Sequence, residues 1–253
     1  MNEMLRNRVF MKCPDLSIDM KKSDQEMKKP QPPLEKAASG EVIELPVFDT
    51  ALAHLSYLDL LDFRRSERVY TGAPATQEQL AFLLWSVQGV QEIRGENRYA
   101  TLRPVPSGGA RHPFELYIAV LNVERLKQGI YHYLPLEHVG EKQAAIEYLY
   151  PLEDTNDEIT EMLAGQRWAT KASFILLFSC LPYRGEWRYM QAAHRVMLID
   201  LGHAGQNAML SASALGLSSC CIAAYNAEKC DEILGIDGVD EYTVYAVTVG
   251  VPR

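Results

Sequence analysis

The feature that most constrains the fold is a long apolar stretch with helical periodicity, residues 189–215. Apolar side chains occupy several faces of this predicted helix before Gly216 ends it. A helix that is apolar nearly all round must be covered on most sides, so we expect it at the centre of the molecule. Its small residues, Ala204, Gly205 and Ala208 among them, would also let a second helix approach closely, which suits a subunit interface as well as a core.

Three short runs rich in β-branched and aromatic residues, 115–122, 172–180 and 242–250, predict strands. Their apolar density suggests that both faces of each strand are buried. Helices and strands alternate without an internal repeat, so the predicted class is α+β.

Three further helices are predicted from their ends. Thr76 and Gln79 form a capping box for a helix that stops at Gly89. Asn226 caps another helix, which Gly235 closes. A third, residues 50–63, has an apolar residue at every third position and leads directly to Arg64.

Residues 1–45 are polar, rich in Lys, Met and Pro, and have no lasting hydrophobic period. We therefore divide the chain into an N-terminal extended arm, 1–45, and one domain, 46–253. An arm that wraps a partner subunit and a disordered tail fit this composition equally well. The first twenty residues carry charges throughout, which argues against a secretory signal, and the longest apolar stretch, 173–181, is about half a membrane span.

Charge and cysteine content exclude further classes. The chain has 25 Lys and Arg against 33 Asp and Glu, so its overall field attracts neither nucleic acid nor an anionic membrane. Five cysteines, including Cys13, form no C-x-x-C pair and favour a reducing compartment, and we expect a cytoplasmic protein. Adjacent Cys220 and Cys221 are interpreted as small buried hydrophobes. No metal site is expected, because His194 and His203 are not at ligand spacing.

One short basic segment stands out in this acidic chain. The run RRSER, residues 64–68, places three guanidiniums and a hydroxyl just after a predicted helix. Guanidinium groups match phosphate oxygens bidentately and the serine adds a donor, so the segment is suited to hold a phosphate monoester. A solvated charge run paired with Asp59, Asp62 and Glu67 is the alternative.

Two segments of small residues would let backbone amides face a ligand. In PSGGARHP, residues 106–113, paired glycines permit close approach to a flat ligand, although the spacing is not G-x-G-x-x-G and an ordinary turn is the alternative. Residues 216–225 form a second such segment, predicted as a loop between two helices.

Taken together, these segments resemble the nitroreductase superfamily of FMN enzymes, and within it the SagB-type dehydrogenase branch. The resemblance runs from about residue 30 to the C-terminus. It is carried by RRSERVYTG (64–72), LLWSVQGV (83–90), PSGGARHPFELY (106–117), GIYHY (129–133), GHAGQN (202–207), ALGLSS (214–219) and the terminal VGVPR.

The resemblance implies a homodimer with a central mixed or antiparallel sheet flanked by helices, the long helix at the dimer interface, and two FMN molecules contacted by both chains. One subunit would hold the phosphate, and the partner's glycine segment would line the isoalloxazine. The backbone N–H groups of Ala223 and Ala224 would face flavin N5, and Gln166 would face the pyrimidine edge. The implied cofactor-binding residues are Arg64, Arg65, Ser66, Arg68 and Arg253 for the phosphate, and Pro106, Ser107, Gly108, Gly109, Gln166, Cys221, Ile222, Ala223 and Ala224 for the ring.

The implied activity is hydride transfer from NADH or NADPH through flavin N5 to a flat acceptor such as a nitroaromatic or a quinone. Family members that oxidise peptide azolines carry a Lys-Tyr pair before the long helix, and Arg188 and Tyr189 occupy the matching positions here. Tyr189 is therefore a candidate catalytic residue, whereas arginine cannot readily release a proton as a lysine would. An azoline dehydrogenase acting on a ribosomal peptide with partner proteins, and a flavin carrier or sensor with little turnover, are the alternative functions.

Overall fold

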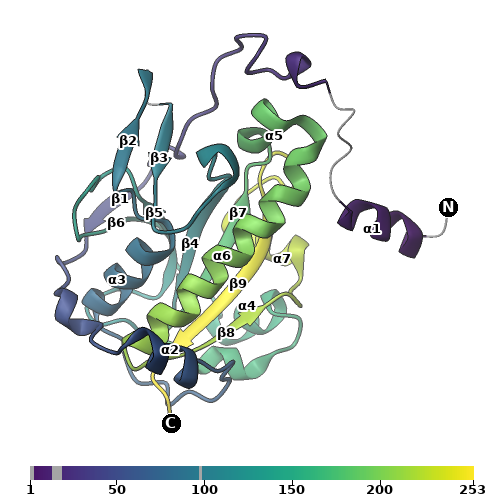
Figure 1. Ribbon diagram of the computed structural model, residues 1–253. Helices are drawn as coiled ribbons and strands as arrows, with labels where there is room; N and C mark the ends of the chain where they lie inside the picture. The colour runs from purple at the N-terminus through teal and green to yellow at the C-terminus, as the bar shows by residue number, and fades with distance from the viewer. Residues whose placement is uncertain (1–2, 13–18, 97–98) are drawn as a thin grey trace.

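The computed structural model describes residues 3–12, 19–96 and 99–253. Its centre is a seven-stranded sheet in the order β1-β6-β5-β4-β7-β9-β8, with every neighbouring pair antiparallel (Figure 1). The predicted α+β class with a central sheet is confirmed. The strands are β1 (Glu41–Glu44), β4 (Phe114–Val120), β5 (Gly129–Leu134), β6 (Ala145–Tyr150), β7 (Phe174–Cys180), β8 (Ser218–Ile222) and β9 (Tyr242–Gly250), and β2 (Glu92–Arg94) pairs with β3 (Ala100–Leu102) in a separate ribbon.

The three strands predicted from apolar runs are β4, β7 and β9, which lie side by side in the sheet. Every residue of β4 and β7 is buried, as their composition predicts. Alternate side chains point to opposite faces: Leu116 and Ile118 join one apolar core, whereas Tyr117 and Ala119 join a second. The sheet is thus the middle layer of three.

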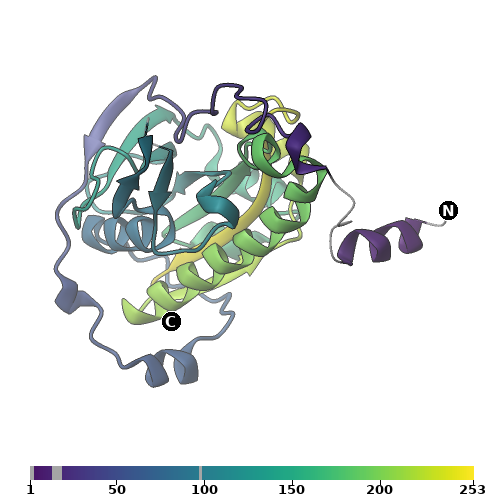
Figure 2. The ribbon, with the colours of Figure 1, turned by 45° about the horizontal axis from the view of Figure 1, so that its top comes forward.

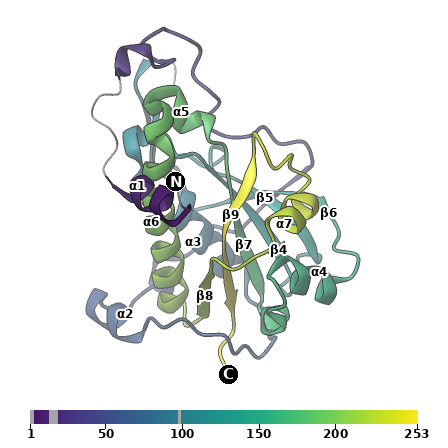
Figure 3. The same cartoon turned by 90° about the vertical axis from the view of Figure 1, so that its right-hand side faces the viewer.

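Helices cover both faces of the sheet (Figure 3). On one face lie α3 (Gln77–Gln88) and α6 (Ala193–Ala214), and on the other lie α4 (Thr155–Met162) and α7 (Ala227–Leu234). The predicted caps of α3 and α7 are confirmed. Thr76 Oγ1 accepts a hydrogen bond from Gln79 N at 3.1 Å, the Gln79 side chain accepts one from Thr76 N at 2.9 Å, and Gly235 ends α7 with a φ of +64°.

The long central helix is shorter than predicted at its start. Residues 183–189 form a separate helix, α5 (Tyr183–Tyr189), and Met190, with a φ of +51°, breaks the chain direction before a 3-10 turn leads into α6. The sheet-facing side of α6 is buried, but Leu198 and Ile199 are 55% and 46% exposed. One apolar face of this helix therefore remains uncovered within the described chain.

The single helix predicted over residues 50–63 is wrong. Two capping side chains start two separate pieces: Asp49 accepts from Ala51 N at the 3-10 turn Thr50–Leu52, and Ser56 accepts from Asp59 N at α2 (Tyr57–Phe63). Apolar spacing alone could not show this interruption. No residue of α2 is buried.

The predicted N-terminal arm runs along the body from residue 19 onward (Figure 2). Helix α1 (Glu3–Met11) has no buried residue and stands clear of the body in Figure 2, but its last residue reaches α6, where Arg195 Nε donates to Met11 O at 3.2 Å. Further along, Trp187 Nε1 donates to Lys29 O at 3.1 Å. The last residues of the arm form β1 at the edge of the sheet. A domain boundary at residue 45 stays a prediction, and Cys13 lies outside the described residues.

Buried charges hold the end of the arm. His132 on β5 contacts Glu115 on β4 at 2.9 Å and Glu147 on β6 at 3.0 Å, and all three side chains are nearly inaccessible to solvent. The remaining carboxylate oxygens accept hydrogen bonds from backbone N–H groups of the arm, with Glu115 Oε1 bound by Lys36 N at 2.9 Å and Glu147 Oε2 by Gly40 N at 2.7 Å. The buried cluster and the arm thus satisfy each other's polar groups.

None of the helices in the described ranges is long and apolar enough to cross a bilayer. The cytoplasmic location stays a prediction.

Candidate functional site

The basic segment after α2 runs along the β8 edge of the sheet. Ser66 forms an isolated parallel bridge with Ser219, and Glu67 N donates to Ser219 O at 2.9 Å. Ser218 Oγ donates to a carboxylate oxygen of Glu67. Further along, Thr71 N donates to Val251 O at 3.0 Å, which brings the chain end beside the same segment. Arg64–Arg68 is therefore fixed by β8 and by the C-terminal residues.

The three guanidiniums of this segment are not neutralised. Among the residues that the structure describes, Arg64, Arg65 and Arg68 form no salt bridge with a carboxylate, so the alternative of an ion-paired charge run is not what the fold shows. Arg65 Nη1 donates only to Arg64 O at 2.8 Å, and the Arg68 guanidinium lies 5.9 Å from the ring centre of Trp168. These charges are available to an anion.

A cavity of about 200 Å³ opens at this place. It is lined by Arg65, Glu67, residues 216–219 and Pro252. Arg253 follows Pro252, which forms a bridge with Tyr70. The predicted phosphate-binding residues Arg64, Arg65, Ser66 and Arg68 therefore share one region with the C-terminus.

The small-residue segment 216–225 is only partly a loop, which corrects the sequence-based prediction. Its middle is strand β8, paired with β9 through Cys220 and Cys221. Cys221 Sγ lies 3.7 Å from Gly205 O on α6, and Ile222 is buried. Burial raises the pKa of both adjacent thiols, so they stay protonated near neutral pH, in agreement with a packing role.

Ala223 and Ala224 follow β8 as an exposed turn. Within the described chain, neither of their N–H groups donates a hydrogen bond to another residue. Gln166 Nε2 donates to Ala224 O at 2.8 Å, across 58 positions of sequence. The structure thus brings Gln166 to the two residues whose amides are predicted to face the flavin.

The glycine segment, residues 106–113, lies away from the basic segment, at the start of α6. Ser107 Oγ and Gly108 N donate to Asp200 Oδ2 on α6 at 2.7 and 2.9 Å. A side chain at Gly108 would come within 2.4 Å of Val196, and Gly109 has a φ of +61°, so both positions require glycine. The segment, which begins at Pro106, therefore packs on the first turns of α6, whereas the basic segment lies near its end at Gly216 (Figure 1).

The basic segment, residues 64–68, and the glycine segment do not meet within one chain, although both are predicted to contact the flavin. Asp200 and Gly216 are separated by about 24 Å along a helical rise of 1.5 Å per residue. Within one chain, Pro106–Gly109 and the basic segment therefore lie near opposite ends of α6. This separation agrees with the expectation that each half of the site comes from a different subunit.

Tyr189 and Arg188 lie beside the glycine segment. A Cβ added at Gly109 would meet Tyr189 Oη at 2.6 Å and the Arg188 side chain at 3.0 Å. The Arg188 guanidinium lies 5.3 Å from the Tyr189 ring centre and donates to Tyr99 Oη. The pair therefore stands at the start of α6 rather than beside Ala223 and Ala224.

Sequence reasoning missed two residues of this site. Asp200, a carboxylate inside an apolar helix, holds the glycine segment, and its isolation among apolar neighbours was the available signal. Trp168, two residues after Gln166, packs against Arg68 and against Tyr70 at a ring-centre distance of 6.2 Å. No local pattern points to that contact.

The Nitroreductase family model matches residues 61–251, which is three quarters of the chain and includes the site just described except its last residues, Pro252 and Arg253. The chain belongs to the nitroreductase family. A relative in Methanocaldococcus jannaschii, itself named as a nitroreductase, is 28% identical over 211 residues, covering 83% of this chain and 98% of that protein.

A second relative of this chain is the trifolitoxin-processing protein TfxB of Rhizobium leguminosarum bv. trifolii. It is 35% identical over 127 residues, which cover 48% of this chain and 33% of that protein. One chain of the Escherichia coli microcin synthetase McbBCD complex, solved with truncated pro-MccB17 bound, shares the fold at a TM-score of 0.60 and 19% identity, covering 97% of this chain and 86% of that one. The resemblance to the superfamily and to its SagB-type branch is confirmed, and the chain is an oxidoreductase of a flavin-using family.

Proposed function

We propose that this nitroreductase is an FMN-dependent enzyme that transfers hydride from NADH or NADPH to a flat acceptor such as a nitroaromatic or a quinone. The observation that carries the proposal is the grouping of unpaired guanidiniums and free backbone amides along one edge of the sheet. When bound, FMN would supply the hydride-transfer chemistry, and the protein would bind, orient and shield it.

The described residues fit FMN at both of its ends. The side chains of Arg64, Arg65 and Arg68 carry three charges without carboxylate partners, which suits the ribityl phosphate. Ser66 and Arg253 would add a hydroxyl and a fourth guanidinium there. At the other end, the N–H groups of Ala223 and Ala224 bind no described residue, and their small side chains leave room for them to donate to a ring nitrogen.

The protein's own contribution is electrostatic and geometric. Backbone N–H donors held by β8 and by the Gln166 contact are fixed before a ligand arrives, so they need no reorganisation during reaction. The side-chain oxygen of Gln166 accepts no hydrogen bond from a described residue, which leaves an acceptor free for the ring edge. No nucleophile or metal is required for these roles.

We also propose that the working enzyme is a homodimer. The glycine segment and the basic segment lie near opposite ends of α6, and the partner's Pro106–Gly109 would complete each site. Apolar surface is available for such an interface: α2 exposes 67% of Leu58 and 62% of Phe63, and α6 exposes Leu198.

The test is a visible spectrum followed by anaerobic reduction. Purified protein loaded with FMN should show bound flavin and lose its visible absorbance when NADH or NADPH is added. The double variant Arg65→Gln/Arg68→Gln should bind FMN at least about tenfold more weakly, since two charge-assisted contacts are lost. Arg94→Gln, which changes an exposed arginine paired with Glu92, is the matched control. Protein that stays colourless with excess FMN refutes the proposal.

An azoline dehydrogenase acting on a ribosomal peptide is the second candidate function. It is favoured by the similarity to a trifolitoxin-processing protein and by the fold shared with a chain of a microcin synthetase. Loss of two hydrogen atoms from an azoline peptide, seen by mass spectrometry with flavin-loaded protein, would support it. Tyr189→Phe should then slow that reaction while leaving reduction by NADH or NADPH unchanged.

A flavin carrier or sensor would give a third result. Its flavin would bind, but neither NADH nor NADPH would bleach it. The same spectroscopic experiment therefore separates it from the first proposal.

A further inference from the structure

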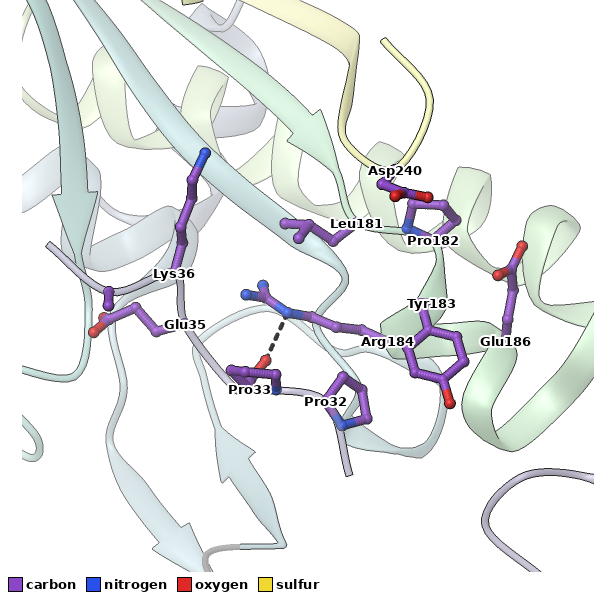
Figure 4. Close-up of a pocket in the computed structure, with 11 residues that line it drawn as sticks. Pro32, Pro33, Glu35, Lys36, Leu181, Pro182, Tyr183, Arg184, Glu186 and Asp240 are labelled. Atoms are coloured by element: carbon purple, nitrogen blue, oxygen red, sulfur yellow. Dashed lines mark hydrogen bonds between the residues drawn. The ribbon is translucent and has the colours of Figure 1, made fainter. Parts of the chain in front are cut away.

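A second cavity, of about 620 Å³, lies between the arm and the start of α5 (Figure 4). One wall is the arm segment 32–37, the other is Leu181–Glu186, and Asp240 closes the rim. None of these residues belongs to the candidate flavin site. The volume is in the range of pockets that hold small organic ligands.

Buried side chains fix the arm wall of this cavity. Arg184 Nε donates to Pro33 O at 2.8 Å, which is the dashed line in Figure 4. Lys36 N donates to Glu115 Oε1 at 2.9 Å. Since the Arg184 guanidinium and Glu115 are themselves buried, these bonds are protected from water, and the cavity is preformed.

The surface of the cavity is mainly apolar. Pro32 and Pro33 stand on one side and Leu181 and Pro182 on the other, with the aliphatic stem of Arg184 between them. Such walls favour an aliphatic or aromatic group over a fully polar ligand.

The charges that line the cavity do not balance. Carboxylates outside the lining already neutralise both of its cations, since Arg184 pairs with Glu115 and Lys36 Nζ pairs with Glu241 at 2.7 Å. This leaves an excess of negative charge on the cavity wall.

The excess negative charge lies on one rim of the cavity, at Asp240 and Glu186. Asp240 is exposed and forms no salt bridge within the described residues, and Glu186 uses one oxygen for His194 at 2.7 Å. The Tyr183 ring lies between the arm and Glu186 (Figure 4), and an aromatic face attracts cations. Glu35 is turned to Leu136, whose N–H it accepts at 2.6 Å.

We propose that this cavity binds a small hydrophobic amine in its ammonium form, with the apolar part between the proline and leucine walls and the charge at Asp240 and Glu186. A neutral ligand of the same shape would leave Asp240 and the second oxygen of Glu186 without a cation, and an anion would be repelled by both carboxylates. The proposal does not depend on flavin binding.

The test is calorimetric titration of the full-length protein with three probes of similar shape: phenethylamine, 2-phenylethanol and 3-phenylpropionate. The amine should bind at least about tenfold more tightly than the alcohol, because one favourable ion pair at a partly shielded rim is worth about that factor. Equal affinity for amine and alcohol would overturn the proposal.

Substitutions at the rim test whether the amine binds in this cavity. Asp240→Asn/Glu186→Gln should abolish the preference for the amine, whereas Glu124→Gln, which removes an exposed carboxylate elsewhere, should keep it. An unchanged preference in the double variant would contradict the assignment.

A second variant keeps the test open should the double variant fail to fold. Ala37 lies exposed on the arm wall, so Ala37→Arg adds a guanidinium to the cavity without touching a buried group. Amine binding should fall at least about tenfold and the carboxylate probe should now bind. Full amine affinity in this variant would show that the amine binds elsewhere.

Discussion

His132 should control how the stability of this protein depends on pH above neutrality. Its ring is buried between the carboxylates of Glu115 and Glu147, at 2.9 and 3.0 Å. Burial alone would lower the pKa of the imidazole, but hydrogen bonds to both carboxylates outweigh it and raise the pKa from 6.5 to about 9. The folded protein therefore holds a proton that the unfolded chain releases near neutrality.

The sign and size of the effect follow from this shift. A histidine with a raised folded-state pKa stabilises the fold fully below its unfolded pKa, and the contribution is lost as pH rises through the folded value. The shift from 6.5 to about 9 corresponds to about 3 kcal/mol, of which about 2 kcal/mol should disappear between about pH 6 and about pH 8.5.

Two other groups also titrate in this window. Burial raises the pKa of Glu35 to about 7, so the folded state holds that proton too, and about 1 kcal/mol of its contribution should disappear between about pH 6 and about pH 8. Burial would lower the pKa of His138, but hydrogen bonds to Glu44 and Glu141 outweigh it and raise that pKa above its ordinary value.

The remaining groups titrate elsewhere. The lowered pKa values of Glu115 and Glu147 make their contributions disappear on acidification instead. Burial raises the pKa of the Cys180 and Cys230 thiols to about 12, so they add a dependence only above the pKa of a free thiol, about 8.5. His112 stays neutral, because burial lowers its pKa well below 6.5.

The measurement is urea unfolding, followed by tryptophan fluorescence at a series of pH values from about 6 to about 8.5. The free energy of unfolding should fall across the series by about 2 kcal/mol through His132 and by about 1 kcal/mol more through Glu35, the latter mostly below about pH 7.5. The controls are Glu35→Gln and His138→Gln, because the pKa values of both groups are also raised, although the His138 side chain is less buried than that of His132. A flat profile, or a slope above about pH 7.5 that Glu35→Gln or His138→Gln removes, would refute the assignment to His132.

Three further changes should have defined effects. Thr76→Ala removes the helix cap of α3 and should lower the free energy of unfolding by about 1 kcal/mol, measured by urea unfolding. Gly40→Ala would place a methyl group 2.4 Å from the backbone oxygen of Tyr148, so it should cost about 1–3 kcal/mol in the same assay and speed hydrogen exchange in the arm. Gln166→Ala releases the Ala224 carbonyl and should weaken FMN binding about tenfold in a fluorescence titration, with little change in stability; unchanged affinity would contradict a role at the flavin.

Much of the fold was predictable because its signals are local. The capping box that starts α3 and the Asn226 cap of α7 involve residues three positions apart, and both helices end where the sequence predicts. The runs that became β4, β7 and β9 are apolar on both faces, which is a property of the central position they occupy.

The errors come from contacts or conformations that periodicity does not describe. The helix expected over 50–63 divides because Ser56 caps a new start, and the long helix begins late because Met190 takes a left-handed conformation. Strand β8 has little β-branched character, so its sequence predicts a loop. It is extended because it pairs with β9 at the sheet edge.

The candidate site shows the same division. The sequence alone supplied its residue types: a basic run in an acidic chain, paired glycines, and a small-residue segment after a long apolar helix. Whether Arg65 is neutralised, and whether Gln166 meets Ala224, depended on tertiary contacts. The distance between the basic run and the paired glycines also depended on the tertiary structure.

The sequence by itself determined the α+β class, the main helices and strands, and the family, because each rests on patterns within a few neighbouring residues or on their order along the chain. Only the tertiary structure decided that His132 is protonated between two carboxylates, that the arm closes a second cavity, and that one chain holds the two halves of its site apart. These features depend on charges and backbone groups that are distant in sequence, and their energies are set by burial and separation, which a linear pattern does not contain.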